Sequence, residues 1–198
     1  RSRDDQVEDL AALRMGVRAD KEGVLTYDFH SAGAGEGQRG IVRAQGSGFT
    51  TSISRRFFLQ DAAFLVGLEG DDLNLLERLD AALRAPVHPI GLGRRSHVPS
   101  CPVAMEPSDE HRTGVRASVD LQTALECEPW PIATIPWWQQ RRLERDAVRL
   151  ILEDSSGPII RPDQPVGAAF ATRVFGPRAV RIDHCSPKRK EIHRDRDT

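Results

Sequence analysis

One stretch near the middle of the chain constrains the fold more than any other, because it carries the signals for a strand, a turn and a helix in succession. The segment Phe57–Leu68 is almost continuously apolar, which predicts a strand buried on both faces. The turn Gly70–Asp72 follows, and an aspartate there can cap a helix by accepting hydrogen bonds from its first N–H groups. Leucines then recur at helical spacing, at Leu76, Leu79 and Leu83. Pro86 ends this helix, so we expect a strand and a helix that pack on each other.

The segment Gly91–His97 after this helix has the composition of a phosphate-binding loop. Gly91 and Gly93 allow another backbone to approach closely, and Arg94 and Arg95 offer forked donors that stay charged. Main-chain N–H groups of the glycine stretch, the two arginines and the hydroxyl of the following serine could all bind a phosphate. The alternative is a loop whose arginines form salt bridges with the acidic helix, and the spacing alone does not decide between the two.

Length and charge distribution fit a single domain with local basic regions. The chain has 198 residues, enough to bury a core, and a net charge of −1. Its arginines nevertheless cluster: four lie between residues 37 and 60 and three between residues 81 and 96, with no acidic residue in either range. The first group consists of Arg39, Arg43, Arg55 and Arg56. Two basic regions on a near-neutral body suit a local contact with a polyanion, although solvated loops explain the charge alone equally well.

The cysteine and histidine pattern favours a cytoplasmic protein without a metal centre. Cys101, Cys127 and Cys185 are unevenly spaced and form no Cys-x-x-Cys, which indicates a reducing compartment. His97 and His111 lie near the first of them but match no standard zinc spacing, so we expect no metal and no cofactor. No apolar run reaches membrane-spanning length, so we expect no membrane contact.

Three pieces of the chain resemble the CasD (Cas-five) family of subunits of the type I-E CRISPR Cascade complex. They are RRFFLQDAAFLVGLEGD from Arg55, ALRAP ending at Pro86, and LGRRSHVPSCP ending at Pro102; the opening RSRDD and later PW and DQP pieces match more loosely. The resemblance implies an α+β fold: a ferredoxin-like or RNA-recognition-like core of the RAMP superfamily, a projecting glycine-rich thumb and a small C-terminal β segment. It also implies that the family's first strand and helix are missing before Arg1.

The family resemblance further implies a non-catalytic subunit that binds the 5′ handle of crRNA and caps the backbone filament of Cascade in antiviral defence. The implied partners are crRNA, the CasC-type backbone subunit and the CasA-type large subunit, with target DNA reached indirectly. The implied RNA-binding residues are Arg39, Arg43, Arg55, Arg56, Gly91, Gly93, Arg94, Arg95, Ser96 and His97.

The thumb corresponds to residues 30–54, within an expected core domain of residues 1–103. This segment has six glycines and few apolar side chains, so it cannot form its own core and is expected to be mobile. In the family such an insertion reaches along the guide RNA and contacts the neighbouring backbone subunit. Arg55 and Arg56 stand at its base, although they could instead be charges that protect a strand edge.

An enzymatic alternative remains, because relatives in another CRISPR subtype resemble metal-independent endoribonucleases that trim precursor crRNA. Acid–base cleavage requires titratable groups within hydrogen-bond reach of a 2′-hydroxyl, and Tyr27 and His30 are the candidate pair. A strand-end aromatic residue and a turn histidine are the simpler interpretation. Three tryptophans (Trp130, Trp137 and Trp138) could stack on bases, but we favour a subunit interface for them.

The remaining elements are expected from local patterns. Met15–Ala19 and Val24–Phe29 alternate and predict a hairpin, whereas Val119–Leu125 and Arg141–Leu152 have helical spacing. Residues 104–198 are expected to form a variable C-terminal segment. It would end in a hairpin turning at Gly176–Pro177, with strands at 168–175 and 179–184, and a charged tail.

Overall fold

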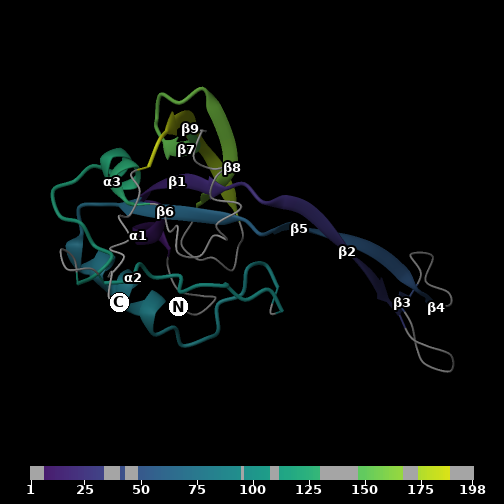
Figure 1. Cartoon of the computed structure of the whole chain (residues 1–198). Helices are drawn as coiled ribbons and strands as arrows, with labels where there is room; N and C mark the ends of the chain where they lie inside the picture. The colour runs from purple at the N-terminus through teal and green to yellow at the C-terminus, as the bar shows by residue number, and fades with distance from the viewer. Residues whose placement is uncertain are drawn as a thin grey trace, which may run out of the picture. The chain divides into compact units, whose positions relative to one another are not determined.

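A computed structural model describes residues 7–33, 41–42, 49–94, 96–107, 112–129, 147–166 and 174–187. Along this part of the chain, a short helix is followed by a run of strands, then by two helices and a second run of strands (Figure 1). In chain order they are α1 (Glu8–Ala11), β1 (Arg14–Lys21), β2 (Val24–Ala32), β3 (Ile41–Val42), β4 (Phe49–Thr50), β5 (Ser52–Gln60), β6 (Ala63–Glu69), α2 (Leu73–Arg84), α3 (Leu121–Cys127), β7 (Val148–Glu153), β8 (Ile159–Pro165) and β9 (Phe175–Cys185).

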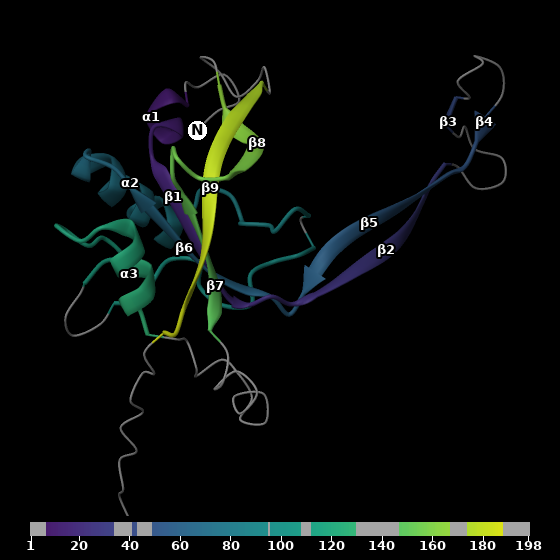
Figure 2. The same cartoon turned by 90° about the horizontal axis from the view of Figure 1, so that it is seen from above.

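The main sheet has five strands in the order β6-β1-β7-β9-β8, and the ladders of β9 with β7 and with β8 are antiparallel. Three of these strands come from the chain after residue 147, so the C-terminal segment completes the sheet that β1 and β6 begin (Figure 2). Helices and an antiparallel sheet together confirm the expected α+β class.

The core forms where α3 packs on one face of this sheet. Leu121 and Leu125 of α3 meet Leu150 and Leu152 of β7, and all four are buried. Two glycines of the sheet face the helix so closely that a Cβ on Gly16 or Gly67 would come within 2.6 or 2.7 Å of a leucine methyl. Leucine side chains of α3 therefore pack directly against the backbone of β1 and β6 at these two glycines.

The chain divides into two compact units, a body (Arg1–Arg18 with Leu65–Thr198) and a ribbon unit (Ala19–Phe64). The ribbon unit contains the long antiparallel pair of β2 and β5, with Tyr27 opposite Phe57. The expected hairpin between Met15–Ala19 and Val24–Phe29 is therefore wrong, since β1 lies in the main sheet and β2 pairs with β5. The expected mobile segment 30–54 also has strand at both of its ends, because β2 extends to Ala32 and β5 begins at Ser52.

For the central stretch, the predicted helix is confirmed and the predicted buried strand is wrong. The Asp72 carboxylate accepts a hydrogen bond from the Leu75 amide at 3.1 Å, and α2 ends two residues before Pro86. The apolar run Phe57–Leu68 forms two strands, β5 and β6, because Asp61 adopts a positive φ of 60° between them. Neither strand is buried on both faces, since side chains alternate between partial burial and exposure along β6 and are mostly exposed along β5.

Two predictions for the C-terminal segment are also corrected. The helix expected up to Leu152 is the strand β7 from Val148 onward, and Val148, Leu150 and Leu152 alternate into the core. The expected hairpin at Gly176–Pro177 is wrong because β9 runs straight through it and pairs with β8. The helix expected at Val119–Leu125 is confirmed as α3. In the described part of the chain, every helix is too short or too polar to cross a membrane.

Candidate nucleic-acid interface

The segment Gly91–His97, called the arginine loop below, is closed by its own backbone hydrogen bonds. The Leu92 amide donates to the His97 carbonyl at 2.7 Å, and the His97 amide donates to the Arg94 carbonyl at 3.1 Å. Gly93 has a φ of +81° and nothing within 4 Å of an added Cβ. The loop is thus a tight turn with open space beside its glycine, which supports a backbone that another molecule can approach.

Two of the main-chain N–H groups expected to bind phosphate already donate hydrogen bonds within the loop. The Leu92 amide is bonded to the His97 carbonyl, and the Gly93 amide donates to the Gly91 carbonyl at 3.1 Å. Both donors are therefore occupied within the loop. The side chains that could bind a phosphate here differ in exposure: Ser96 is exposed, and Arg94 and His97 are half-buried.

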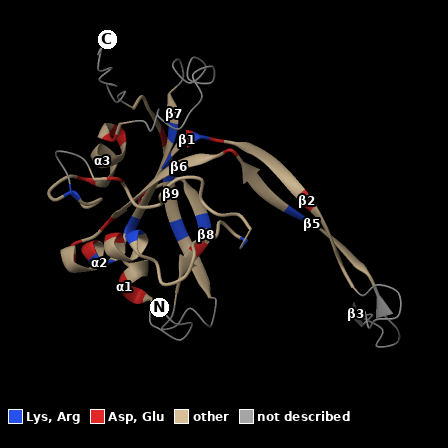
Figure 3. Ribbon diagram, turned by 60° about the horizontal axis from the view of Figure 1, so that its bottom comes forward, with Lys and Arg blue, Asp and Glu red and all other residues tan. Residues whose placement is uncertain are grey.

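The β2–β5 ribbon has two chemically different faces. Directly opposed residues of an antiparallel pair share a face, so the register separates the side chains into two sets. One set contains Arg55, a serine and a group of exposed apolar side chains: Leu25, Tyr27, Phe29, Ile53, Phe57 and Leu59. The other set carries most of the polar side chains (Thr26, Asp28, His30, Ser52, Ser54, Arg56 and Gln60), together with Val24, Ala32 and Phe58. Figure 3 shows a basic segment (blue) on β5 and an acidic segment (red) on β2.

Arg55 and Arg56 consequently point to opposite faces. Arg55 lies over the ring of Tyr27, with its guanidinium carbon 5.4 Å from the ring centroid, and that ring lies 5.8 Å from the ring of Phe57. The arrangement is a cation–π contact extended by a tilted aromatic pair. Arg56 lies opposite Asp28 on the polar face.

The candidate catalytic pair is divided in the same way. Tyr27 shares the apolar face with Phe57, whereas His30 lies opposite Ser54 on the polar face. Residues three apart on a strand point to opposite sides, so the two side chains do not converge on one atom.

The other residues expected in a site are placed as follows. Arg39, Arg43, Arg95, His111 and the three tryptophans lie outside the described residues. Gly91, Gly93, Arg94, Ser96 and His97 belong to the body, and Arg55 and Arg56 belong to the ribbon unit. Among the described residues, no group of three or more His, Cys, Asp or Glu side chains could hold a metal ion.

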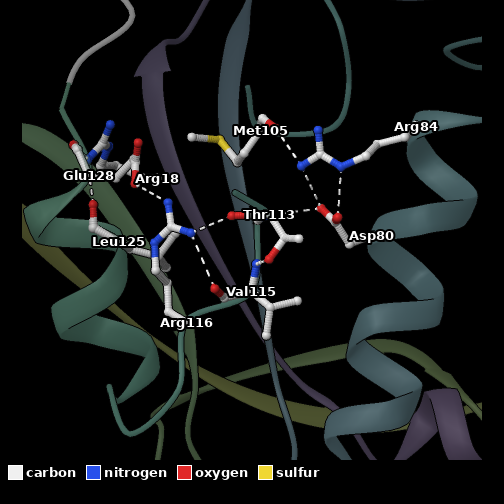
Figure 4. A network of polar contacts seen from close by, with 10 residues as sticks. Arg18, Asp80, Arg84, Met105, Thr113, Val115, Arg116, Leu125 and Glu128 are labelled. Carbon is white, nitrogen blue, oxygen red and sulfur yellow. Dashed lines mark hydrogen bonds and ion pairs between the residues drawn. The ribbon is translucent and has the colours of Figure 1, made fainter. Parts of the chain in front are cut away.

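A polar network in the body was not predicted from the sequence (Figure 4). Arg18 of β1 is fully buried, and its Nη1 donates to the carbonyls of Leu125 and Glu128, the latter at 2.7 Å, so it caps the end of α3. Arg116 donates to the Thr113 carbonyl at 2.7 Å and lies 3.5 Å from the Glu128 carboxylate. No local pattern marks Arg18, because its partners lie more than a hundred residues further along the chain.

A second part of this network is built on Asp80 of α2. Its Oδ2 accepts from Arg84 Nε at 2.8 Å, and its Oδ1 accepts from the Gly114 amide at 3.0 Å. The hydrogen bond from Arg84 holds the pKa of Asp80 below its ordinary value; partial burial opposes this shift, and the Gly114 amide supports it. Asp80 is thus a charged group that joins the helix to the chain beyond the arginine loop.

Comparison with known proteins gives one family and a shared fold. A family model described as CRISPR-associated protein (Cas_Cas5) matches residues 1–181. A structure titled "Crystal structure of Cas protein" is 37% identical with a TM-score of 0.65, and one titled "CRISPR RNA-guided surveillance complex" is 26% identical with a TM-score of 0.66. Each match covers 93% of this chain and 72% of the other. No match was found among curated proteins.

Proposed function

The chain belongs to the Cas_Cas5 family of CRISPR-associated proteins, and from this premise we propose that it is a non-catalytic, RNA-binding subunit of a CRISPR surveillance complex. In the finer form of the proposal it is a CasD-type subunit of a type I-E Cascade. It holds the 5′ handle of crRNA, caps the filament of CasC-type subunits, helps to seat the CasA-type subunit and meets target DNA only through the guide.

The observation that carries the proposal is the arginine loop. Its turn is already closed in the free chain by the hydrogen bond from Leu92 to His97, so little ordering remains to be done on binding. Arg94 and Ser96 lie within that closed turn, and Arg95 follows Arg94 directly in sequence. A pre-formed turn with adjacent arginines suits the phosphates of a folded or single-stranded RNA segment, which proteins recognise largely by shape and backbone.

The two faces of the ribbon support a thumb that contacts RNA and protein at the same time. The polar face, with Arg56 and His30, suits the phosphates and 2′-hydroxyls of the guide. The apolar face, with Phe29, Phe57 and Leu59, is exposed in the free chain and suits the apolar surface of a neighbouring backbone subunit. In this proposal the ribbon lies between the guide and that subunit.

The proposal is tested with the double variant Arg94→Ala/Arg95→Ala. Loss of two charge-assisted contacts is expected to weaken binding of a repeat-derived RNA by about 10- to 100-fold. The slope of log affinity against log salt should fall by about 1.4, since each phosphate contact on a single strand contributes roughly 0.7. The measurement is a fluorescence-anisotropy titration at several salt concentrations, with co-purification of the neighbouring subunits as a second readout.

The matched control is Arg78→Ala, which removes an exposed arginine from α2 of the same body. We expect this variant to bind RNA within about twofold of the parent, because a distant surface charge is largely screened. Equal affinities of the double variant and the parent protein would show that the arginine loop is not an RNA contact.

The runner-up function is a metal-independent endoribonuclease that processes precursor crRNA. The ribbon register supports the non-catalytic proposal instead, because Tyr27 and His30 point to opposite faces. The same protein preparation should therefore leave repeat RNA uncut. Specific cleavage that disappears in His30→Ala would favour the enzyme.

A further inference from the structure

The arginine loop belongs to a long segment without helix or strand. Between the end of α2 at Arg84 and the start of α3 at Leu121, every described residue is irregular. Irregular connections of this length are uncommon in compact domains, and no ladder of helix or sheet hydrogen bonds fixes their backbone. The position of the arginine loop therefore depends on where this segment is anchored to the body.

The first anchor is the ion pair between Asp80 and Arg84 on the last turns of α2 (Figure 4). Besides its bond to Oδ2, Arg84 donates through Nη2 to Asp80 Oδ1 at 3.0 Å and to the Met105 carbonyl at 2.7 Å. Asp80 in turn accepts from the Gly114 amide. One forked pair thus fixes two points of the irregular segment, residues 105 and 114, onto the helix.

Gly114 shows how close this attachment is. A Cβ at this position would lie 2.7 Å from Oδ1 of Asp80, so a larger residue would push the carboxylate away from the backbone. The Asp80 side chain is 12% exposed and the Arg84 side chain 30%. Partial exclusion from water strengthens such a charge-assisted contact relative to a fully exposed pair.

Arg84 and both stems of the arginine loop border one groove. Ile90, directly before the loop, and Pro99, shortly after it, line one groove together with Leu83 and Arg84 at the end of α2. The second anchor, Arg116 with Glu128, ties the far end of the segment to the end of α3. The part between Arg84 and residue 105, which contains the loop, is thus closed at its two ends by the hydrogen bond from Arg84 to the Met105 carbonyl.

We propose that Asp80 and Arg84 are positioning residues for RNA binding: their ion pair sets the place of the arginine loop, and neither side chain is itself an RNA contact. The expected effect of this ion pair on RNA affinity rests on the proposed function. Its role in holding the arginine loop in place does not.

The sharpest test is Asp80→Asn, because positioning and simple electrostatics predict opposite signs. Removing a negative charge should strengthen RNA binding if charge alone matters. The positioning role predicts that binding weakens by about five- to tenfold, the effect of losing roughly one charge-assisted hydrogen bond. Asparagine can still accept from the Gly114 amide, which keeps that part of the attachment.

Two further variants complete the set. Arg84→Lys keeps the positive charge but cannot make the forked contact, so it should behave like Asp80→Asn. Glu77→Gln is the matched control, since it removes one negative charge from an exposed position of the same helix. We expect Glu77→Gln to bind RNA equally well or slightly more tightly.

Hydrogen exchange of the Leu92 and His97 amides measures the loop directly, because both are bonded within it. In Asp80→Asn and Arg84→Lys these amides should exchange about tenfold faster, while the amides of Leu76 and Leu79 in α2 keep their rates. General unfolding would instead accelerate exchange in the helix as well.

Each outcome decides the inference. Faster exchange in the loop together with weaker RNA binding supports it. Unchanged loop exchange overturns it, and so does faster exchange with unchanged RNA affinity, because the position of the loop would then not set binding. If the parent protein binds no RNA, the proposed function fails, and the exchange rates alone decide whether the ion pair holds the loop.

Discussion

The two arginine-bearing regions of this chain are stabilised in different ways. The arginine loop has almost no regular structure, yet internal hydrogen bonds close it, and an ion pair of α2 holds the segment that contains it. The ribbon of β2 and β5 is regular along nine residue pairs, yet its apolar side chains are exposed. Regular secondary structure and fixed position are therefore separate properties.

The comparison also indicates that the arginine loop and the ribbon become ordered at different stages. An isolated pair of strands is marginally stable in water, since it buries too little apolar surface to offset its loss of conformational entropy. Ring contacts such as that of Tyr27 with Phe57 add only a modest stabilisation. The loop is thus closed in the free chain, whereas the ribbon would gain much of its stability from a partner that covers its apolar face.

The largest expected contrast is in the free energy lost when a leucine is truncated to alanine in each of the two compact units. Leu150→Ala removes a side chain that is 0% exposed and belongs to the core cluster, so it should lower the free energy of unfolding by about 3 kcal/mol. Leu59→Ala removes a side chain that is 50% exposed, so its cost should stay below about 1 kcal/mol. Chemical denaturation measures both, and a cost for Leu59→Ala similar to that for Leu150→Ala would contradict the comparison.

A smaller contrast comes from two glycines with left-handed backbone. Gly93 in the loop has open space around it, so Gly93→Ala should cost only the backbone strain of about 1 kcal/mol. Gly23, between β1 and β2, has a φ of +75°, and a Cβ there would lie 2.7 Å from the Cβ of Ala62. Gly23→Ala should therefore cost roughly twice as much. Equal changes in the free energy of unfolding would show that the turn at Gly23 can relax.

The smallest expected effect is a change in thermal stability at acidic pH. Because the folded-state pKa of Asp80 is lowered, its stabilising contribution is present above the ordinary aspartate value of about 3.9 and is lost as pH falls through the lowered value. The difference in Tm between the parent protein and Asp80→Asn should thus narrow below about pH 4. The ring contact of Tyr27 with Phe57 involves no carboxylate, so Tyr27→Leu serves as the comparison and its Tm difference should stay constant.

Elements with strong local signals were predicted well from the sequence. The position of α2 follows from the Asp72 cap, the leucine spacing and Pro86, all within fifteen residues. The strand β7 was mistaken for a helix because short apolar runs satisfy both periodicities, and only the sheet selects the alternating set of Val148, Leu150 and Leu152. The break between β5 and β6 at Asp61 could not be predicted, because no glycine or proline stands there.

The composition of the candidate site can be read from the sequence, but its arrangement cannot. The sequence identifies Arg94 and Arg55 as basic residues near glycine-rich stretches, and the resemblance to a family suggests their role. It does not reveal that the Leu92 amide is already bonded, because that depends on the closure of the loop. It also does not reveal the partners of Arg18 or Asp80, which come from distant segments.

The close seating of α3 on Gly16 and Gly67 has a consequence for how this sequence can drift over generations. A Cβ at Gly16 would also lie 3.0 Å from a methyl group of Leu152 and 3.2 Å from one of Leu121, so a methyl group gained there forces Leu125 to shift or to become smaller. Alanine at Gly16 should therefore be less costly in a chain whose residue 125 is already smaller than leucine.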